Sequence, residues 1–522
     1  MSDPKTRHLH DELAANSSRV VAETRYGPVT GGRAANGTAV WLEIPYGLPP
    51  GRFQDPEPLP DDFRYEEKEY IREASYCVQP TNDGQASGTP FQDKVGYGQP
   101  TENPLFLNIV CPPEFPENKG PFPVKVYIHG GFLQFGSPHG LKFQEQYVSD
   151  ESKDVRVNIG YRLSAFGFLA CDEPKVNGNF GFKDQWLGLK WVSKNIASFG
   201  GDPNDIQLMG LSAGGHSVHQ CLHHASRLPQ GVKAPFQSAV LLSNAIILKP
   251  KTRQELRPQY QALCRALSLD PEDPHTLQIL RDPTRIPASR IAEVIETDAV
   301  GTEYGTYRAC LDDDWMAADP EPMTWQASGQ LAAKLLEKGV KTVIVGDTKE
   351  EWYLYSIAHP ISTPADIKPN LERYYPADMV DRMMKMYRTL PDDASEEESK
   401  RLFGEILSDW QVHFPARLLA RDLYNAGYPV LRYEVRWVPD EARPEGYVTH
   451  ASDTPVWHFR IPTLESDQPV AKNWLEAIKS ETQSLKADRR PVEDVLTLKE
   501  DKQIEWRRDA VWEEKMRLLD AL

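Results

Sequence analysis

The chain has 522 residues, 40% of them hydrophobic, and a formal net charge of −17. This charge disfavours nucleic acid or an anionic membrane as the main partner, and no apolar stretch is long enough to cross a bilayer. The polar N-terminus shows no secretory signal, so we expect a soluble, cytoplasmic protein unless a signal peptide has been removed.

The length suits one large domain, because neither an internal repeat nor a low-complexity linker divides the chain. We expect this domain to span residues 1–522, with a flexible N-terminus at 1–18. Residues 18–53 alternate apolar and polar side chains around turns, which predicts short antiparallel strands. Residues 54–100 are interrupted by proline and glycine and are expected to be mostly irregular.

Compact apolar runs then recur along the chain and predict the strands of a sheet covered on both faces. They lie at residues 105–110, 124–128, 155–159, 206–209, 238–243, 342–346 and 430–435. Helices are predicted at residues 184–199, 250–340, 364–427 and 507–519. This alternation predicts an α/β fold with a mostly parallel central sheet flanked by helices. The stretches at 250–340 and 364–427 are expected to be helical excursions over the active-site side, where ligands bind in such folds.

The motif Gly210-x-Ser212-x-Gly214 follows the predicted strand at 206–209 and precedes a helix. A strand that turns into a helix within a residue or two strains the serine backbone, and side chains in place of the glycines would collide with neighbouring backbone. The serine hydroxyl is left exposed at the sheet edge, beside the positive end of a helix. Small residues at this spacing also close ordinary turns. The interpretation as a nucleophile elbow therefore depends on the other parts of a serine hydrolase.

A serine nucleophile needs a histidine base, and the histidine needs a carboxylate that orients it. In α/β-hydrolases these residues follow one another in the order serine, acid, histidine, which Ser212, Glu351 and His450 satisfy. The acid and the histidine each lie in a segment that follows a predicted strand. Periodicity does not choose between Glu350 and Glu351. His458 competes with His450, but position relative to the sheet favours His450.

Attack of a serine on an acyl carbonyl places negative charge on oxygen, which fixed backbone N–H groups stabilise. Ala213, the residue after the serine, offers one such group. The turn His129-Gly130-Gly131-Phe132 offers others, from Gly131 and Phe132. A tight turn that needs positive φ would also explain the glycines, but the presence of the elbow favours an oxyanion hole.

Further motifs follow in one order along the chain. They are Ile44-Pro45-Tyr46, Leu105-Phe106-Leu107-Asn108-Ile109, His129-Gly130-Gly131, the run from Tyr161 to Leu169, Asp184-Gln185, the run from Trp191 to Ile196, and Phe199-Gly200-Gly201-Asp202-Pro203. With these motifs the chain resembles type B carboxylesterases, the cholinesterase-like branch of the α/β-hydrolases, from about Val20 to His450. The family's pattern Gly-x-x-Lys-(Asp/Glu)-Glu-Gly matches residues 346–352 except that Trp352 replaces its last glycine, and it selects Glu351. The family's His-x-x-Asp pattern selects His450.

The resemblance implies an α/β-hydrolase fold and a serine hydrolase that cleaves carboxylic esters through an acyl-enzyme intermediate, without a metal or a cofactor. Its partner would be a small-molecule ester, and Phe132, Phe135 and Trp352 suggest a hydrophobic acyl or alcohol group. A homodimer is one option for its assembly. Two alternatives stay open: a catalytically silent binding module of the same fold, and an amidase or lactonase that uses the same triad.

Three departures from the family pattern carry further expectations. Pro104 stands where secreted relatives place a cysteine that pairs with one near Cys77, which favours an intracellular protein. Phe132 replaces a third glycine of the oxyanion loop and should narrow the acyl side of the pocket. Ala245 replaces a serine that often supports the acid, so we expect Glu351 to be held in another way.

Four histidines follow the elbow at helical spacing: His216, His219, His223 and His224. A metal site is one interpretation, but no carboxylate or thiolate accompanies them except Cys221, which lies on another face of the helix. We therefore expect buried histidines that pack and form hydrogen bonds. The six cysteines show no Cys-x-x-Cys spacing and are expected to be buried free thiols.

Overall fold

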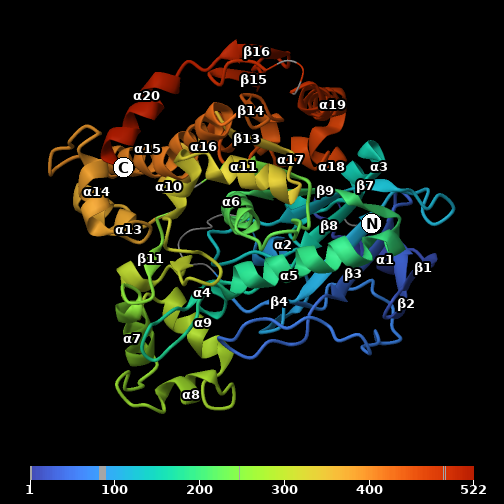
Figure 1. The fold of residues 1–522 in the computed structure, drawn as a ribbon, viewed down its shortest axis with the longest axis horizontal. Helices are drawn as coiled ribbons and strands as arrows, with labels where there is room; N and C mark the ends of the chain where they lie inside the picture. Colours follow the sequence, from blue (N-terminus) through green and yellow to red (C-terminus); the bar gives the residue numbers. More distant parts are fainter. Residues whose placement is uncertain (1–2, 82–89, 246, 248, 486, 488) are drawn as a thin grey trace.

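The computed structural model describes residues 3–81, 90–245, 247, 249–485, 487 and 489–522. Its centre is a twelve-stranded sheet with the order β1-β2-β3-β6-β8-β7-β9-β10-β13-β14-β15-β16 (Figure 1). The strands of this sheet are β1 (Arg19–Thr24), β2 (Gly27–Arg33), β3 (Ala39–Pro45), β6 (Phe106–Cys111), β7 (Phe122–Ile128), β8 (Val155–Ile159), β9 (Gly201–Leu211), β10 (Ser238–Leu242), β13 (Thr342–Thr348), β14 (Val430–Val435), β15 (Asp494–Leu498) and β16 (Ile504–Arg508). Two small sheets pair β4 (Ser75–Cys77) with β5 (Gln99–Thr101), and β11 (Lys251–Thr252) with β12 (Cys310–Leu311).

Neighbouring strands run parallel from β8 across to β15, whereas β1, β2, β3 and β6 pair in antiparallel fashion at the start of the sheet. A mostly parallel sheet with N-terminal antiparallel strands is therefore confirmed. Because β9, β10, β13 and β14 are parallel neighbours, their carboxyl ends meet at one edge of the sheet.

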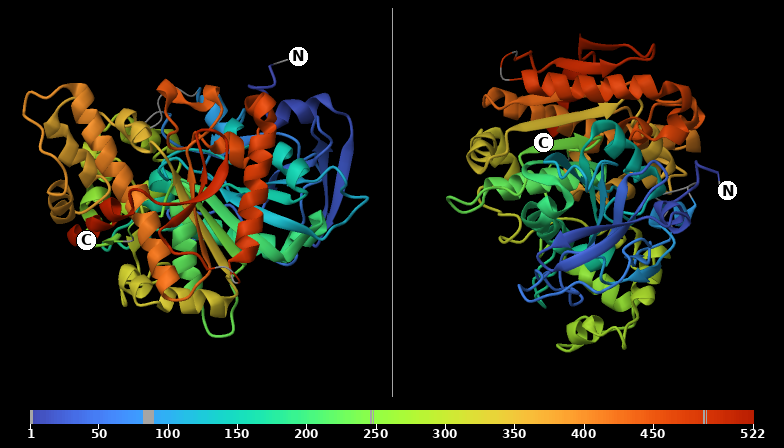
Figure 2. Two further views of the ribbon diagram at one scale, coloured as in Figure 1. Left: turned by 90° about the horizontal axis from the view of Figure 1, so that it is seen from above. Right: turned by 90° about the vertical axis from the view of Figure 1, so that its right-hand side faces the viewer.

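Helices cover both faces of the sheet. They are α1 (Leu9–Ala15), α2 (Phe91–Val95), α3 (Gln146–Ser152), α4 (Ser164–Phe168), α5 (Phe180–Asn195), α6 (Ala213–Ser226), α7 (Arg257–Ala266), α8 (Thr276–Arg281), α9 (Ala288–Glu296), α10 (Pro322–Ala327), α11 (Gln330–Lys338), α12 (Trp352–Ile357), α13 (Ile367–Glu372), α14 (Ala377–Met384), α15 (Glu396–Ser408), α16 (Phe414–Asn425), α17 (Thr454–Trp457), α18 (Ile461–Leu464), α19 (Gln468–Ser484) and α20 (Trp512–Met516). Figure 2 shows α19 running along the sheet.

The core is divided by the sheet, because successive side chains of a strand point to opposite faces. Leu208 of β9 and Leu241 of β10 pack in the cluster that contains the apolar residues of α5 and α6. Their neighbours Met209 and Val240 pack in the cluster that contains Trp474 of α19. A strand buried on both faces is a rigid support for residues that follow its end.

The two predicted helical excursions are helical. Residues 250–340 contain α7 to α11, and residues 364–427 contain α13 to α16. The second group packs against α12, which follows β13, through α15. It also shares an apolar cluster with Phe132.

Two predictions at the ends of the chain are wrong. Residues 1–18 are predicted to be flexible, but within the described part of this segment α1 buries Leu9 and Leu13 against Ile71 and Val110. Residues 1 and 2 lie outside the described residues. The helix expected at 507–519 is instead the end of β16 followed by the short α20. At the N-terminus the apolar side chains pack on residues far along the chain, and at the C-terminus Arg507 and Arg508 pair with β15. Local sequence pattern reveals neither contact.

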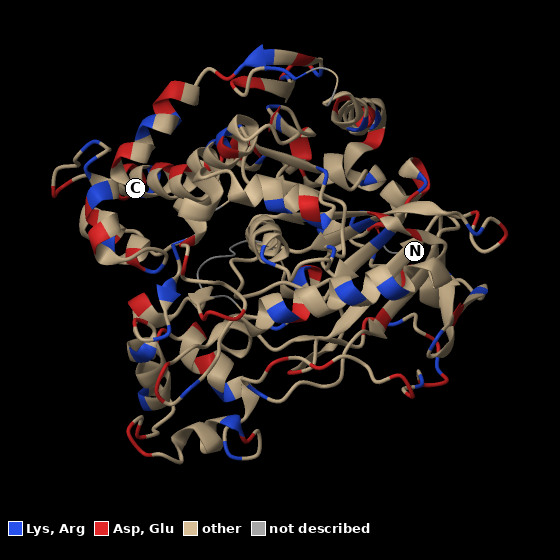
Figure 3. Ribbon diagram, in the orientation of Figure 1, with Lys and Arg blue, Asp and Glu red and all other residues tan. Residues whose placement is uncertain are grey.

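Acidic and basic segments alternate over the ribbon (Figure 3).

None of the helices within the described ranges is both long and apolar enough to cross a bilayer. All six cysteines are buried and free of disulfides.

Candidate functional site

Ser212 occupies the sharp turn between β9 and α6. Its backbone has φ 59° and ψ −123°, a left-handed conformation that is strained for a residue with a side chain. Gly214 allows the turn to lie against β7, because a Cβ there would stand 2.0 Å from the carbonyl oxygen of Ile128. The geometry is that of a nucleophile elbow.

Glu351 and His450 form a buried pair at the same edge of the sheet. Glu351 follows β13 and His450 lies in the loop after β14. His450 Nδ1 and Glu351 Oε2 are 2.6 Å apart, with the two side chains 1% and 0% exposed. His450 Nε2 is also buried, and it has no hydrogen-bond partner within the described residues. That nitrogen is therefore available as a proton acceptor.

The acid is held by backbone rather than by a serine. The Thr348 N–H donates to Glu351 Oε1 over 2.8 Å, while the side chain of Ala245 has no polar atom that could do so. This confirms that Glu351 is supported in another way than by the family's serine. A backbone donor fixes one carboxylate oxygen and leaves the other for the histidine.

Glu350 and His458, the alternatives to Glu351 and His450, contact other residues. Glu350 accepts a hydrogen bond from the Val448 N–H at 2.9 Å, and its own N–H donates to the Val448 carbonyl at 2.8 Å. It therefore fixes the loop that carries His450, a role that periodicity did not indicate. His458 is paired with Glu145, 3.2 Å away, and its ring packs on Tyr127.

The loop after β7, residues 129–135, borders the elbow; we call it the glycine loop. A Cβ on Gly130 would lie 3.0 Å from Ser212 Cβ, so the loop and the elbow are in contact. On its other side the Phe132 ring lies 6.1 Å from Tyr355, whose ring is 5.2 Å from that of His450. The loop thus connects the serine to the Glu351–His450 pair.

Backbone conformation directs the N–H groups of the glycine loop. Gly131 has φ 109° and Phe132 has φ 56°. The Gly131 carbonyl accepts from Gln134 N–H and Phe135 N–H, at 2.8 and 3.1 Å. The N–H groups of Gly131, Phe132 and Ala213 donate no hydrogen bond to any described residue. They are three donors without a partner at one sheet edge.

Buried polar contacts support the glycine loop from behind. The Tyr161 hydroxyl donates to the His129 carbonyl over 3.0 Å, and the two rings stack at 4.6 Å. Burial lowers the pKa of His129 to about 4, so this histidine is neutral at physiological pH. Gln134 Nε2 donates to the carbonyls of Phe132 and Tyr307, at 3.0 and 2.7 Å. Sequence reasoning missed Gln134, because its partner Tyr307 is distant in the chain.

Comparison with known proteins assigns the family. The model of the carboxylesterase family matches residues 18–482. The chain belongs to the carboxylesterase family. An uncharacterized esterase/lipase of Schizosaccharomyces pombe is 30% identical over 458 residues, which cover 83% of this chain and 82% of that protein. Rat liver carboxylesterase B-1 is 28% identical, covering 82% and 78% of the two chains. This carboxylesterase also shares its fold with a PNB esterase structure, with a TM-score of 0.72 and 24% identity over 95% and 99% of the chains.

Asp453, three residues after His450, is a buried carboxyl of this carboxylesterase. Trp457 Nε1 donates to its Oδ2 over 2.9 Å, and its Oδ1 has no partner among the described residues. Burial, together with the charge of Glu351, raises the pKa of Asp453 to about 7. Between about pH 4 and 7 the folded state therefore keeps a proton that the unfolded state has lost, and stability falls as pH rises.

We expect Asp453→Asn to remove this pH dependence. The amide is uncharged, and its oxygen can still accept from Trp457. The free energy of unfolding of the variant minus that of the wild type should be larger at pH 8 than at pH 5, by on the order of 1–2 kcal/mol. Urea unfolding at the two pH values measures this gain. An equal difference between variant and wild type at both values would contradict the assignment.

The histidines of α6 pack as expected. His216, His219 and His223 are buried, and His224 stacks on Trp315 at 4.0 Å. His219 Nε2 lies 3.0 Å from Gln326 Oε1. In the parts of the chain that the structure describes, no group of three or more His, Cys, Asp or Glu is arranged to hold a metal ion.

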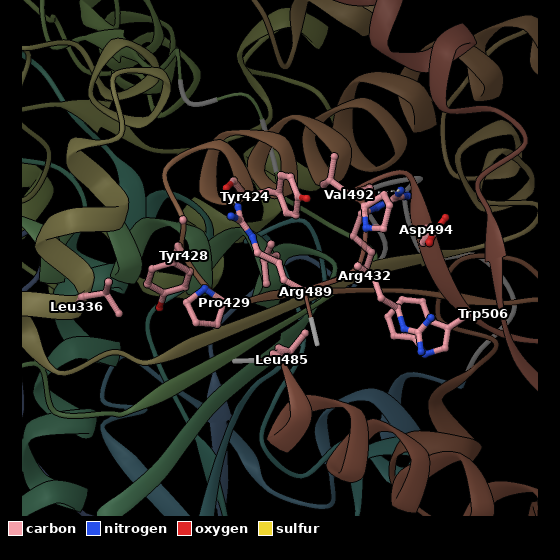
Figure 4. A pocket seen from close by; sticks show the side chains of 14 residues that line it. Leu336, Tyr424, Tyr428, Pro429, Arg432, Leu485, Arg489, Val492, Asp494 and Trp506 are labelled. Carbon is pink, nitrogen blue, oxygen red and sulfur yellow. Dashed lines mark hydrogen bonds between the residues drawn. The ribbon is translucent and has the colours of Figure 1, made fainter. Parts of the chain in front are cut away.

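Two other hollows are separate from this edge. The cavity in Figure 4 is lined by Val430, the first residue of β14, and by Arg489, whose guanidinium lies 3.9 Å from the ring centre of Tyr424. It therefore belongs to the opposite end of the strands. Trp352 packs under Arg401 in a surface hollow, with 3.5 Å between the guanidinium and the ring centre. Trp352, one of the three aromatic candidates for the substrate site, instead lines this hollow, with its ring 5.0 Å from that of Tyr447.

Proposed function

We propose that this carboxylesterase hydrolyses small-molecule esters with Ser212 as nucleophile, His450 as general base and acid, and Glu351 as the residue that orients His450. The buried 2.6 Å contact between His450 Nδ1 and Glu351 Oε2 carries the proposal. It supports a proton on Nδ1, so that in the neutral imidazole the lone pair lies on Nε2. That is the tautomer a serine nucleophile requires.

In the first step Ser212 Oγ bonds to the acyl carbon while its proton passes to His450 Nε2. The carbonyl electron pair becomes an oxyanion, stabilised by the N–H groups of Gly131, Phe132 and Ala213. Glu351 stabilises the imidazolium. Collapse of this intermediate breaks the bond to the alcohol oxygen, which leaves with the proton from Nε2.

In the second step a water molecule attacks the acyl-serine. His450 Nε2 takes the water proton as the oxygen bonds to the acyl carbon. The same nitrogen then returns a proton to Ser212 Oγ as the ester bond to the enzyme breaks. The products are a carboxylic acid and an alcohol, and the serine is regenerated.

The surroundings of the glycine loop favour an ester with an apolar group. Phe132 lies 6.1 Å from Phe135 and from Tyr355, and 6.5 Å from Tyr374, measured between ring centres. These aromatic rings form a wall beside the three N–H donors. Phe132 fills space that a glycine would leave open, which supports a narrow acyl side.

Hydrolysis of 4-nitrophenyl butyrate, together with labelling of Ser212 by a fluorophosphonate, tests the function. We expect turnover and a label on Ser212. A folded protein with neither would favour the catalytically silent binding module. We also propose a reducing, intracellular location, which the six free, buried cysteines support.

Gly131→Ala should lower kcat by roughly 10²- to 10³-fold through misplacement of the oxyanion donors. The φ of 109° disfavours any side chain, and a Cβ there would stand 2.1 Å from the Phe135 carbonyl oxygen. Steady-state kinetics on 4-nitrophenyl butyrate measures the loss. Gly231→Ala is a matched control, because Gly231 has φ 79° with nothing within 4 Å of its Cβ position. Equal losses in both variants would rule out a specific role of Gly131.

A further inference from the structure

A cavity of about 70 Å³ lies beside α6 and is rich in cationic side chains. Its lining includes His216 and four cations, Lys249, Lys251, Arg308 and Arg373. Two carboxylates, those of Glu255 and Glu303, also border it. Such a concentration of positive charge is notable in a chain whose net charge is −17. Whether the cavity can bind an anion depends on which of these cations lack an anionic partner.

Arg308 has none. Among the described residues no carboxylate lies within ion-pair distance of its guanidinium, and no hydrogen bond joins it to another group. Its Nη1 is buried without a partner, and its Cζ lies 4.8 Å from the ring centre of Tyr374. Burial lowers the pKa of Arg308. The side chain is half-buried, and only Nη1 is removed from water. A guanidinium nitrogen buried without an acceptor is destabilising, unless a ligand supplies one.

Arg373 is nearly as isolated. Its side chain is 4% exposed, its Nε is buried without a partner in the described structure, and its closest carboxylate oxygen is Asp298 Oδ1 at 3.9 Å. Lys249, in contrast, already donates to the Leu522 carbonyl at 3.1 Å. Glu255 is turned to Thr252, accepting from its N–H and its hydroxyl at 2.7 and 2.8 Å. Among the four cations of the cavity, Arg308 and Arg373 are those with a side-chain nitrogen buried without a partner in the described structure.

Hydrogen bonds and ring contacts connect the cavity to the edge of the sheet where Ser212 lies. Gln134 bonds both the Phe132 carbonyl of the glycine loop and the Tyr307 carbonyl, which fixes Arg308, the next residue, beside that loop. His216 lies one helical turn after Ser212, and its N–H donates to the Ser212 carbonyl at 2.9 Å. The Tyr374 ring, which Arg308 covers, also packs near Phe132.

We propose that Arg308 binds a carboxylate carried by the acyl or the alcohol group of the ester substrate, and that Arg373 adds positive charge to the same cavity. A planar guanidinium pairs with a carboxylate through two parallel N–H···O bonds. The aromatic wall would hold the apolar carbons between the ester and this carboxylate. The substrate class is therefore an ester with a terminal carboxylate. This inference rests on the proposed function of Ser212.

Matched pairs of esters test the inference. Mono-4-nitrophenyl glutarate is compared with 4-nitrophenyl pentanoate for the acyl side, and 4-acetoxybenzoate with methyl 4-acetoxybenzoate for the alcohol side. In one of the two pairs we expect the anionic ester to have the higher kcat/KM in the wild type. Arg308→Gln should lower that anionic-to-neutral ratio by roughly 10- to 100-fold, the value of a hydrogen-bonded charge. The exposed Arg64→Gln, which changes net charge equally, should leave the ratio unchanged.

A second measurement does not require the variant to fold. In the wild type, hexanoate should inhibit hydrolysis of the neutral ester competitively, and hexanamide should inhibit far less. Ratios unaffected by Arg308→Gln, or equal inhibition by the two compounds, would overturn the inference while turnover and Ser212 labelling persist. Absence of turnover and of labelling would instead overturn the proposed function.

Discussion

Ser212→Ala is expected to lower kcat for 4-nitrophenyl butyrate by roughly a million-fold, as loss of the nucleophile does in other serine hydrolases. Without Oγ no acyl-enzyme forms, and His450 can only activate water from a position that suits a serine proton. Alanine accepts the left-handed backbone of residue 212 no worse than serine does, so the fold should persist.

Stopped assays over long times and active-site labelling provide the measurement. The fluorophosphonate should label the wild type and leave Ser212→Ala unlabelled. The melting temperatures of the two proteins should agree within a few degrees. A loss smaller than about a hundredfold would mean that another residue supplies the nucleophile.

Glu351→Gln is expected to lower kcat by about 10⁴-fold, since the amide imposes the wrong histidine tautomer. The glutamine oxygen can keep the bond from the Thr348 N–H, which leaves its NH₂ group facing His450 Nδ1. A donor at Nδ1 requires the imidazole proton to sit on Nε2. His450 can then no longer accept the proton of Ser212.

Glu350→Gln is the matched control, one residue away. Its amide oxygen can still accept from the Val448 N–H, so we expect a loss below about tenfold. Steady-state kinetics of both variants on the same ester decides between the two neighbours. A larger loss for Glu350→Gln than for Glu351→Gln would reverse the assignment of the acid.

Local sequence pattern was informative where chemistry depends on adjacent residues. Gly210, Ser212 and Gly214 predict a strained turn because the backbone alone forces it, and the turn has that geometry. The spacing of apolar runs predicted the parallel strands β7, β8, β9, β10, β13 and β14 for a similar reason, since burial on both faces leaves a continuous signal. The parallel strand β15 was not predicted. The short β4, β5, β11 and β12 gave no such signal.

Local sequence pattern does not predict the role of a residue that acts through a partner distant in the chain. Periodicity does not separate the adjacent Glu350 and Glu351, and the role of Glu350 is visible only in its bonds to Val448. The role of Gln134 depends on its hydrogen bond to the Tyr307 carbonyl. The packing of Trp352 depends on Arg401, which lies over its ring. Residue type gives the range of possible bonds, and packing selects among them.

The sequence by itself determined the nucleophile elbow, the positions of the core strands that have compact apolar runs, and the resemblance to the carboxylesterase family. Each of these is encoded in residues that are neighbours in the chain. The resemblance already selected Glu351 as the acid, and the tertiary structure shows its contact with His450. Only the tertiary structure showed that Arg308 lies in a cavity beside α6 without an anion of its own. The reason is physical: the free energy of a buried charge depends on what surrounds it in space, and residues far apart in the chain supply those surroundings.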